Sequence, residues 1–183
     1  SLAHMLIVAA NSPGLHMVCR QSFSANQTKK EDSPLSSKYD EMDALLIFDD
    51  VFVPWERVML YDNAEALWQI RLNSASNSLA YHQAIVRLLA KLEFVTAVAG
   101  EIAVAIGADG YLHVQEKMGE LIMQVETIRA LIIASESEGS PDQQQTFIPN
   151  FTYIETARSL GSKYYPRALE ILQLIGAGGF IQL

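Results

Sequence analysis

The sequence predicts an α+β chain in which a short β-rich part precedes several long antiparallel helices. Apolar runs of about five residues lie within the first 60 positions, separated by turn and loop residues, and are typical of strands. After residue 62, apolar residues recur at spacings of three, four and seven, which is the pattern of helices that pack on one another. Strands and helices that are segregated in this way indicate an α+β fold.

The β-rich part is expected to contain strands at residues 5–10, 15–19 and 44–48. Residues 11–14, Asn-Ser-Pro-Gly, are turn residues between the first two strands. Residues 51–53 are expected to continue the third strand until Pro54, which has no N–H to donate to a sheet. Residues 22–37 are rich in Ser, Asn, Gln, Lys and Asp, so the sequence predicts a solvated loop there.

Helices are expected over residues 78–106, 111–135 and 151–174. Residues 107–110, Gly-Ala-Asp-Gly, are typical of a helix C-cap followed by a turn. The polar residues 138–145 predict a loop before the last helical region. Gly161 and Pro166 interrupt that region, and Pro166 is expected to start a new helical segment because proline favours the first helical position.

The composition excludes several classes of protein. Half of the 183 residues are apolar, so the chain can bury a core and is not globally disordered. Thirteen Lys and Arg against 21 Asp and Glu give a net charge of −8, which argues against nucleic acid as a partner. The most apolar stretch, residues 94–107, is too short to cross a membrane. The single cysteine, Cys19, and the lack of a signal peptide predict a cytoplasmic protein.

The sharpest local motif is a glycine cluster at the end of the last helical region, residues 173–180, Gln-Leu-Ile-Gly-Ala-Gly-Gly-Phe. Glycines allow backbone N–H groups to approach a phosphate or a flat ring closely, because no Cβ is in the way. A helix C-cap followed by a turn needs only one or two of these glycines and is the simpler interpretation. The spacing alone leaves both interpretations open.

Two other groups of polar residues are of types that can form a site. Carboxylates crowd residues 40–56, but adjacent carboxylates on a strand point to opposite faces and no histidine is near, so no metal is expected there. His82 and Gln83 begin a very apolar helix, and either side chain needs a polar partner if it is buried, from a ligand or a neighbouring subunit. No nucleophile set is identifiable around Cys19, so the catalytic residues remain unknown.

Several ordered motifs resemble the 4-hydroxyphenylacetate 3-hydroxylase oxygenase family. They are Asn11-Ser-Pro-Gly-Leu15 with Val18-Cys-Arg20, the runs from Pro34 to Asp43 and from Ile47 to Arg57, His82-Gln83 with Arg87 and Lys91, and Tyr165-Pro-Arg167 with Glu170-Ile-Leu-Gln173. The family resembles acyl-CoA dehydrogenases in fold, with an N-terminal helical domain, a middle β domain and a C-terminal four-helix bundle. The resemblance implies a fragment: the end of the β domain at 1–62, a linker or short helix at 63–77, and an incomplete bundle at 78–183.

The resemblance implies part of a two-component flavin monooxygenase. In that family a separate reductase supplies reduced FAD, and the oxygenase hydroxylates a small phenol ortho to its hydroxyl group. The flavin carries the oxygen chemistry, while the protein excludes water and orients the ring. By similarity to the Gln-x-x-Gly-Gly-x-Gly-Tyr segment of acyl-CoA dehydrogenases, the residues expected to contact the FAD of a partner subunit are Gln173, Gly176, Ala177, Gly178 and Gly179. The Arg, Tyr and His that hold the phenol lie largely in the family's N-terminal domain, outside these residues.

Alternatives remain open at this point. One is a non-catalytic helical oligomerisation module in which the glycine turn is a bare cap, and another is an acyl-CoA dehydrogenase-like flavoprotein. The related 4-hydroxybutyryl-CoA dehydratases hold an iron–sulfur cluster with a His and a Cys seven residues apart; here Leu89 stands seven after His82, so no cluster is expected. Residues 78–106 are apolar around much of the helix, which predicts a homo-oligomer, either a dimer or a tetramer.

Overall fold

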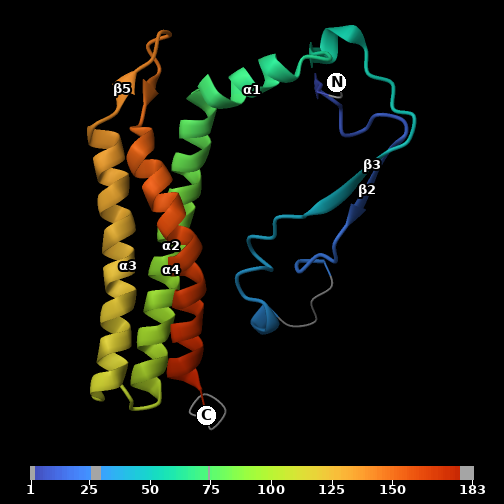
Figure 1. The fold of residues 1–183 in the computed structure, drawn as a ribbon. Coiled ribbons are helices and arrows are strands. Elements are labelled where there is room, and N and C mark those ends of the chain that lie inside the picture. Colours follow the sequence, from blue (N-terminus) through green and yellow to red (C-terminus); the bar gives the residue numbers. More distant parts are fainter. Residues whose placement is uncertain (1–2, 26–29, 74, 178–183) are drawn as a thin grey trace. The chain divides into compact units, whose positions relative to one another are not determined.

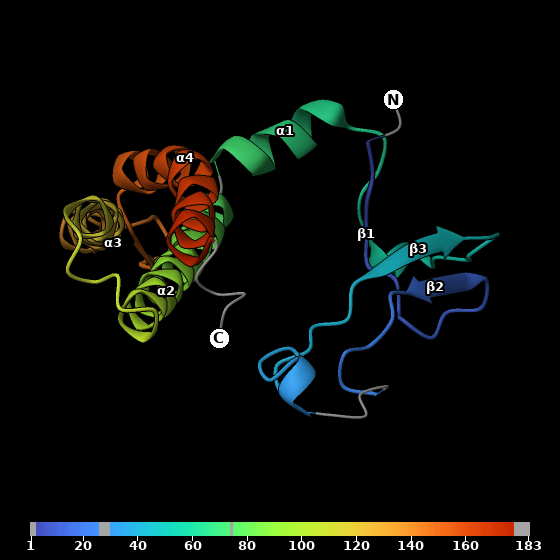
Figure 2. The same ribbon diagram turned by 90° about the horizontal axis from the view of Figure 1, so that it is seen from below.

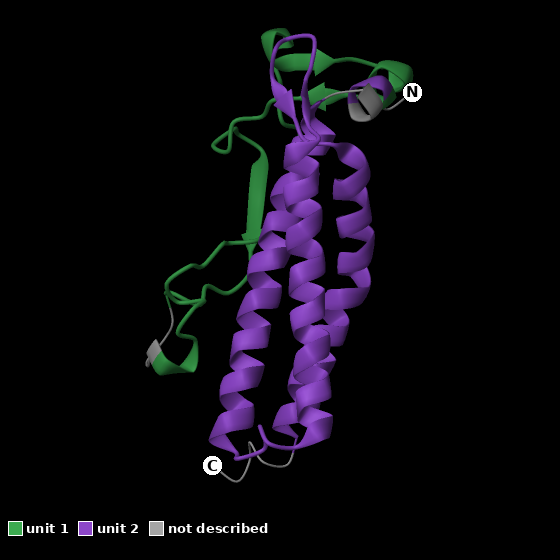
Figure 3. Cartoon of the chain, turned by 90° about the vertical axis from the view of Figure 1, so that its left-hand side faces the viewer, with its two compact units in different colours: residues 1–68 green, residues 69–183 purple. Residues whose placement is uncertain are grey.

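The computed structural model describes residues 3–25, 30–73 and 75–177. The chain divides into two compact units, Ser1–Trp68 and Gln69–Leu183, which Figure 3 colours green and purple. The regular secondary structure of the first unit is mostly strand and that of the second is mostly helix, so the predicted α+β class is confirmed. Helix α1 (Ala64–Asn73) crosses the boundary between the two units.

Two small antiparallel sheets form the first unit. Strand β2 (Leu15–Cys19) lies beside β3 (Ala44–Phe48) in Figure 2. The two strands pair with Leu15 opposite Phe48 and Cys19 opposite Ala44. Strand β1 (Met5–Leu6) pairs with β4 (Val58–Leu60). The 3-10 turns η1 (Lys30–Asp32) and η2 (Trp55–Arg57) lie in the connections. The predicted strands at 15–19 and 44–48 are confirmed with the predicted bounds.

Two details of the predicted strands are wrong. The first strand is much shorter than residues 5–10, because only Met5 and Leu6 find a partner strand. Residues 51–53 do not continue β3, because Asp50 has a left-handed backbone with φ 54° that ends the extended run. The chain instead pairs again at β4, which the sequence pattern did not predict.

The first unit has little core of its own. None of the residues of this unit that the structure describes is fully buried. Side chains of β3 that a sheet normally covers are exposed, including Leu45 at 66% and Phe48 at 56%. A two-stranded ribbon is marginal in water, and continuous apolar strands are typical of sheets covered on both faces.

Three long helices form the second unit and lie side by side (Figure 1). They are α2 (Ala75–Ala105), α3 (Leu112–Ser137) and α4 (Phe151–Gly176). Their core is aliphatic and built from fully buried residues of all three, among them Ile85, Leu92, Leu121, Ile128, Ile154 and Ile171. The expected helices and their approximate bounds are confirmed, because the apolar spacing that predicted them is the spacing of the buried face.

The helix ends follow local sequence signals. Gly107, with φ 67°, closes α2, and the N–H of Ala108 donates to the carbonyl oxygen of Ala103 at 2.8 Å, as in a Schellman cap. Asn150 caps α4, since its side chain accepts from the N–H of Thr152 at 3.0 Å. The predicted loop at 138–145 is part of a short hairpin, in which β5 (Ser140–Pro141) pairs with β6 (Phe147–Ile148).

Helix α4 corrects one further prediction. Pro166 does not start a new segment, because α4 is a single helix through this position. The residues that follow it, Ala168 and Ile171 at 0% exposure and Ile175 at 5%, are buried in the core. That burial offsets the loss of the backbone hydrogen bond that a proline inside a helix removes.

None of the helices in the described ranges is long and apolar enough to span a membrane.

Candidate functional site

The glycine motif lies at the C-terminal end of α4. Gln173 is exposed in the last turn, Gly176 is the last helical residue, and Ala177 is the C-cap with an extended backbone at φ −62° and ψ 123°. Gly178 and Gly179, which complete the predicted contact set, lie outside the described residues. The structure therefore brings Gln173, Gly176 and Ala177 together at one helix end.

The electrostatics of a helix end limit what this turn can do. The last carbonyl groups of a helix carry partial negative charge, which repels a phosphate. A ligand phosphate at this position must therefore be met by N–H groups that follow Gly176, where the chain has left the helix. At Ala177 the backbone is extended and the side chain is a single methyl group. Small side chains and a non-helical backbone fit the close approach of a dinucleotide.

The half of α4 that carries Gln173 is anchored to α3 by an ion pair. The guanidinium group of Arg167 donates from Nε to Oε1 of Glu120 at 2.8 Å and from Nη2 to Oε2 at 2.9 Å. A third bond runs from Nη1 to Oε2 of Glu170 at 2.9 Å. Arg167 lowers the pKa of Glu120 below its ordinary value, chiefly through these hydrogen bonds, and the two carboxylates raise the pKa of Arg167.

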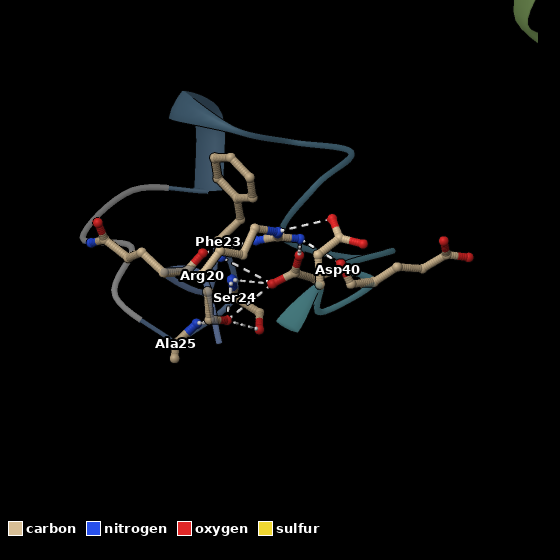
Figure 4. Close-up of polar contacts among 9 residues, drawn as sticks. Arg20, Phe23, Ser24, Ala25 and Asp40 are labelled. Atoms are coloured by element: carbon tan, nitrogen blue, oxygen red, sulfur yellow. Dashed lines mark hydrogen bonds and ion pairs between the residues drawn. The ribbon is translucent and has the colours of Figure 1, made fainter. Parts of the chain in front are cut away.

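A second polar cluster surrounds Asp40 in the first unit (Figure 4). Arg20 donates from Nη2 to Oδ1 of Asp40 at 2.5 Å, and Oδ2 accepts from the N–H of Phe23 at 2.9 Å and from the hydroxyl group of Ser22 at 3.0 Å. The guanidinium group also stacks on the Phe23 ring, 5.0 Å from its centre. The cluster joins the two ends of the connection between β2 and β3. Both carboxylate oxygens of Asp40 accept hydrogen bonds within this cluster, so its role is structural.

The other carboxylates of residues 40–56 do not gather around a common point. Asp43 adds a long contact of 3.6 Å to Arg20. Within the part of the chain that the structure describes, no three His, Cys, Asp or Glu side chains are placed to hold a metal ion. These carboxylates are thus spread over the turn and the strand ends.

His82 has an intrachain partner. Its Nε2 lies 2.8 Å from Oε1 of Glu136, which reaches it from α3. His82 therefore needs neither a ligand nor a neighbouring subunit as its polar partner, and Gln83 is exposed to solvent. The pair is 54 residues apart in sequence, so no local pattern could have identified Glu136.

A cavity of about 500 Å³ lies at the far end of α4 from Gln173. Its lining residues are Ala75, Asn77, Ser78, Glu138, Ser140, Pro141, Asp142, Ile148, Pro149, Asn150 and Phe151. The walls carry two carboxylates and no Lys, Arg or His, so they disfavour the diphosphate of a dinucleotide. Of the predicted flavin-contacting residues that the structure describes, Gln173, Gly176 and Ala177, none lines this cavity.

Solved structures define the class of fold first. A structure of an oxygen-tolerant archaeal 4-hydroxybutyryl-CoA dehydratase from N. maritimus is 20% identical and covers 99% of this chain and 36% of its own, with a TM-score of 0.80, so the two share a fold. The oxygenase component HpaB of 4-hydroxyphenylacetate 3-monooxygenase, solved with FAD and 4-hydroxyphenylacetate, is 39% identical with a TM-score of 0.90, covering 99% of this chain and 38% of that one.

Family models match both units. The model described as 4-hydroxyphenylacetate 3-hydroxylase N terminal matches residues 1–60, and the C-terminal model of the same name matches residues 69–183. The chain belongs to the 4-hydroxyphenylacetate 3-hydroxylase family, which confirms the resemblance drawn from its motifs.

Curated relatives give the same family and show how much of it this chain spans. A probable 4-hydroxyphenylacetate 3-monooxygenase of Bacillus subtilis is 37% identical over 99% of this chain, which spans 37% of that protein. The 4-hydroxyphenylacetate 3-monooxygenase oxygenase component of Thermus thermophilus is 40% identical over 94% of this chain, spanning 36% of that protein. The chain thus spans little more than a third of the length of these relatives.

Proposed function

We propose that this chain is part of the oxygenase component of a two-component aromatic hydroxylase that uses reduced FAD to hydroxylate a small phenol ortho to its hydroxyl group. One observation carries the proposal: a relative solved with FAD and 4-hydroxyphenylacetate matches 99% of the chain at 39% identity and a TM-score of 0.90. In this proposal residues 1–62 end the middle β domain, residues 63–77 form the link, and residues 78–183 belong to the four-helix bundle.

The proposed FAD contacts are Gln173, Gly176, Ala177, Gly178 and Gly179, presented to a partner subunit. The exposed amide of Gln173 and the extended backbone at Ala177 support this assignment. Bound reduced FAD would supply the oxygen activation. The protein chain would position the flavin and keep water away from it. The side chains that hold the phenol belong to parts of the family fold outside this sequence, so the catalytic residues stay unassigned.

The proposed partners are further copies of the chain, in a dimer or tetramer, and a separate flavin reductase in the cytoplasm. An exposed apolar stripe on α2 supports self-association. We define this α2 stripe as Leu79, Val86, Phe94 and Val104, which are 42%, 43%, 53% and 62% exposed. Their spacing puts all four on one side of the helix. Apolar side chains aligned along a helix are typical of a helix that a neighbour covers.

A flavin titration tests the proposal. We expect the full-length gene product to bind reduced FAD, under exclusion of oxygen, more tightly than oxidised FAD, as measured by flavin fluorescence or absorbance. Gly178→Val is expected to abolish this binding while the helical content and the oligomer persist. Gly110→Val is the matched control, because a Cβ there meets nothing within 4 Å.

The same titration separates the alternatives. Unchanged flavin binding in Gly178→Val would remove the assignment of the glycine turn. If neither form of FAD binds the wild-type protein, the helical unit serves self-association alone and the enzymatic proposal fails.

A further inference from the structure

Pro166 interrupts the backbone hydrogen-bond ladder inside α4. Proline has no N–H, and its ring crowds the carbonyl group four residues earlier, so the hydrogen-bond ladder of a helix is weakened at this point. We call residues 167–176 the C-terminal arm of α4. The arm carries Gln173 and leads directly into the glycine turn. Contacts with the neighbouring helices therefore contribute to its direction, among them the core packing of Ala168, Ile171 and Ile175.

The first residue of the arm makes such a contact. Arg167 directs two parallel N–H groups at the two oxygens of Glu120 on α3, at 2.8 and 2.9 Å. A bidentate contact of this kind fixes orientation as well as distance, because both planar groups must align. The third bond, to Glu170 one turn later, joins the same guanidinium group to the arm itself.

The carboxylate of Glu120 is itself held by a second side chain of α3. Gln124, one turn further along α3, is only 2% exposed, and its amide Nε2 lies 3.5 Å from Oε1 of Glu120. A buried amide beside a carboxylate limits the rotamers that the carboxylate can adopt. The chain Gln124, Glu120, Arg167, Glu170 thus runs from the core of α3 to the surface of the arm.

A comparison within α4 shows what is specific to this cluster. Arg158 and Glu155 also form an ion pair, at 3.3 Å, but both residues lie on α4 before Pro166. That ion pair lies within one helix, although the Arg158 guanidinium group also lies over the Tyr81 ring of α2, 4.2 Å from its centre. The two side chains of this ion pair are 49% and 44% exposed, close to the 39% of Arg167 and 32% of Glu120, so the two pairs differ mainly in what they connect.

We propose that Glu120 and Arg167 are positioning residues that set the direction of the C-terminal arm of α4 and thereby place Gln173 and Ala177 for the flavin. The flavin part of this inference rests on the proposed function. Glu120 lies about as many residues before the β5–β6 hairpin as Arg167 lies after it. The antiparallel packing of α3 and α4 therefore brings the two side chains together.

Hydrogen exchange of the full-length protein tests the mechanical part. In Glu120→Gln we expect the amides of residues 170–176 to exchange about tenfold faster, as the loss of a charge-assisted bidentate contact implies, while residues 152–160 keep wild-type rates. Glu155→Gln is the control and leaves the arm unchanged. If Glu120→Gln does not fold, Arg167→Lys, which keeps the charge and loses the fork, takes its place with the same readouts.

Steady-state rates test the positioning part. We expect the reduced-FAD concentration at half-maximal rate to rise about tenfold in Glu120→Gln, with the rate at saturation close to wild type. A merely structural loss would lower the amount of active protein and hence the saturated rate.

The outcomes distinguish the two proposals. Unchanged exchange in the arm overturns the inference, and so does faster exchange with unchanged flavin dependence. If Glu120→Gln shows faster exchange in the arm but the wild-type protein binds no flavin, the anchoring of the arm is confirmed and the proposed function is refuted.

Discussion

Gly14 occupies a position where the backbone leaves no room for a Cβ atom. Its φ of 80° is left-handed, and a Cβ there would lie 2.1 Å from the carbonyl oxygen of Asp49, whose N–H donates to the Gly14 carbonyl group at 2.9 Å. We expect Gly14→Ala to lower the free energy of unfolding by about 3 kcal/mol or more, from backbone strain and overpacking together. Urea unfolding followed by tryptophan fluorescence measures this loss.

Gly107 provides the control for Gly14. It is also left-handed, at φ 67°, but a Cβ there meets nothing within 4 Å. Gly107→Ala should therefore show the conformational cost alone, about 1–2 kcal/mol. Equal losses in the two variants would mean that the backbone around Asp49 relaxes and that the close approach is unimportant.

Asp40 gives the first unit a defined pH dependence. Arg20 lowers the pKa of Asp40 below its ordinary 3.8, chiefly through a hydrogen bond to the ionised carboxylate. Because the pKa is lower in the folded state, the stabilisation is present at neutral pH and is lost as the pH falls through that lowered value. We expect Asp40→Asn to melt at a lower temperature than wild type at pH 7 and to lose this difference near pH 2.

Asp50→Asn is the matched control for Asp40→Asn. Asp50 has a left-handed backbone, which asparagine also tolerates, and it is exposed. Its melting temperature should stay near that of wild type at pH 7. A difference between Asp40→Asn and wild type that persists at pH 2 would show that the cluster around Asp40 acts by shape and not by charge.

At the scale of the element, α4 is a helix stabilised by its neighbours against one unfavourable residue. Pro166 is exposed, so its ring contributes no core packing, while it removes one backbone hydrogen bond. We expect Pro166→Ala to raise the free energy of unfolding by about 1–3 kcal/mol, measured by urea titration followed by circular dichroism. A loss of stability instead would show that α3 and α4 pack against a bend that only proline provides.

Helix α2 is also defined by tertiary context. Its buried residues Ile85, Leu92 and Ala99 repeat every seven positions and face α3 and α4. Gly161 allows α4 to approach, since a Cβ there would lie 2.4 Å from a methyl group of Leu88. The α2 stripe occupies another side of the same helix and stays exposed in the single chain.

At the scale of the whole molecule, the α2 stripe predicts self-association. We expect Phe94→Arg to shift the wild-type oligomer towards monomer in sedimentation experiments at micromolar concentration, because a buried unpaired charge is costly. Ser159→Arg, on an exposed position of α4, is the control. A wild-type protein that sediments as a monomer would contradict the proposed oligomer, and an unchanged oligomer in Phe94→Arg would place the interface elsewhere.

Local sequence patterns predicted much of this fold. Strands 15–19 and 44–48, three long helices, the cap at Gly107 and the α+β class all follow from short-range periodicity and turn chemistry, which act within a few residues. The ordered motifs predicted the family, which the matches over residues 1–60 and 69–183 confirm. The five-residue flavin contact set stays a prediction, and part of it lies outside the described residues.

Only the tertiary structure decided which distant residues meet. Glu120 and Arg167 are 47 positions apart, and His82 and Glu136 are 54 apart, so each pair depends on the rotation and offset of packed helices. Core packing also keeps α4 a single helix at Pro166, where the preference of proline for the first helical position predicted a new segment. Sequence by itself determined the elements and the family, because those signals are local or ordered along the chain. Partner choice across helices needs three-dimensional packing, which no short-range pattern encodes.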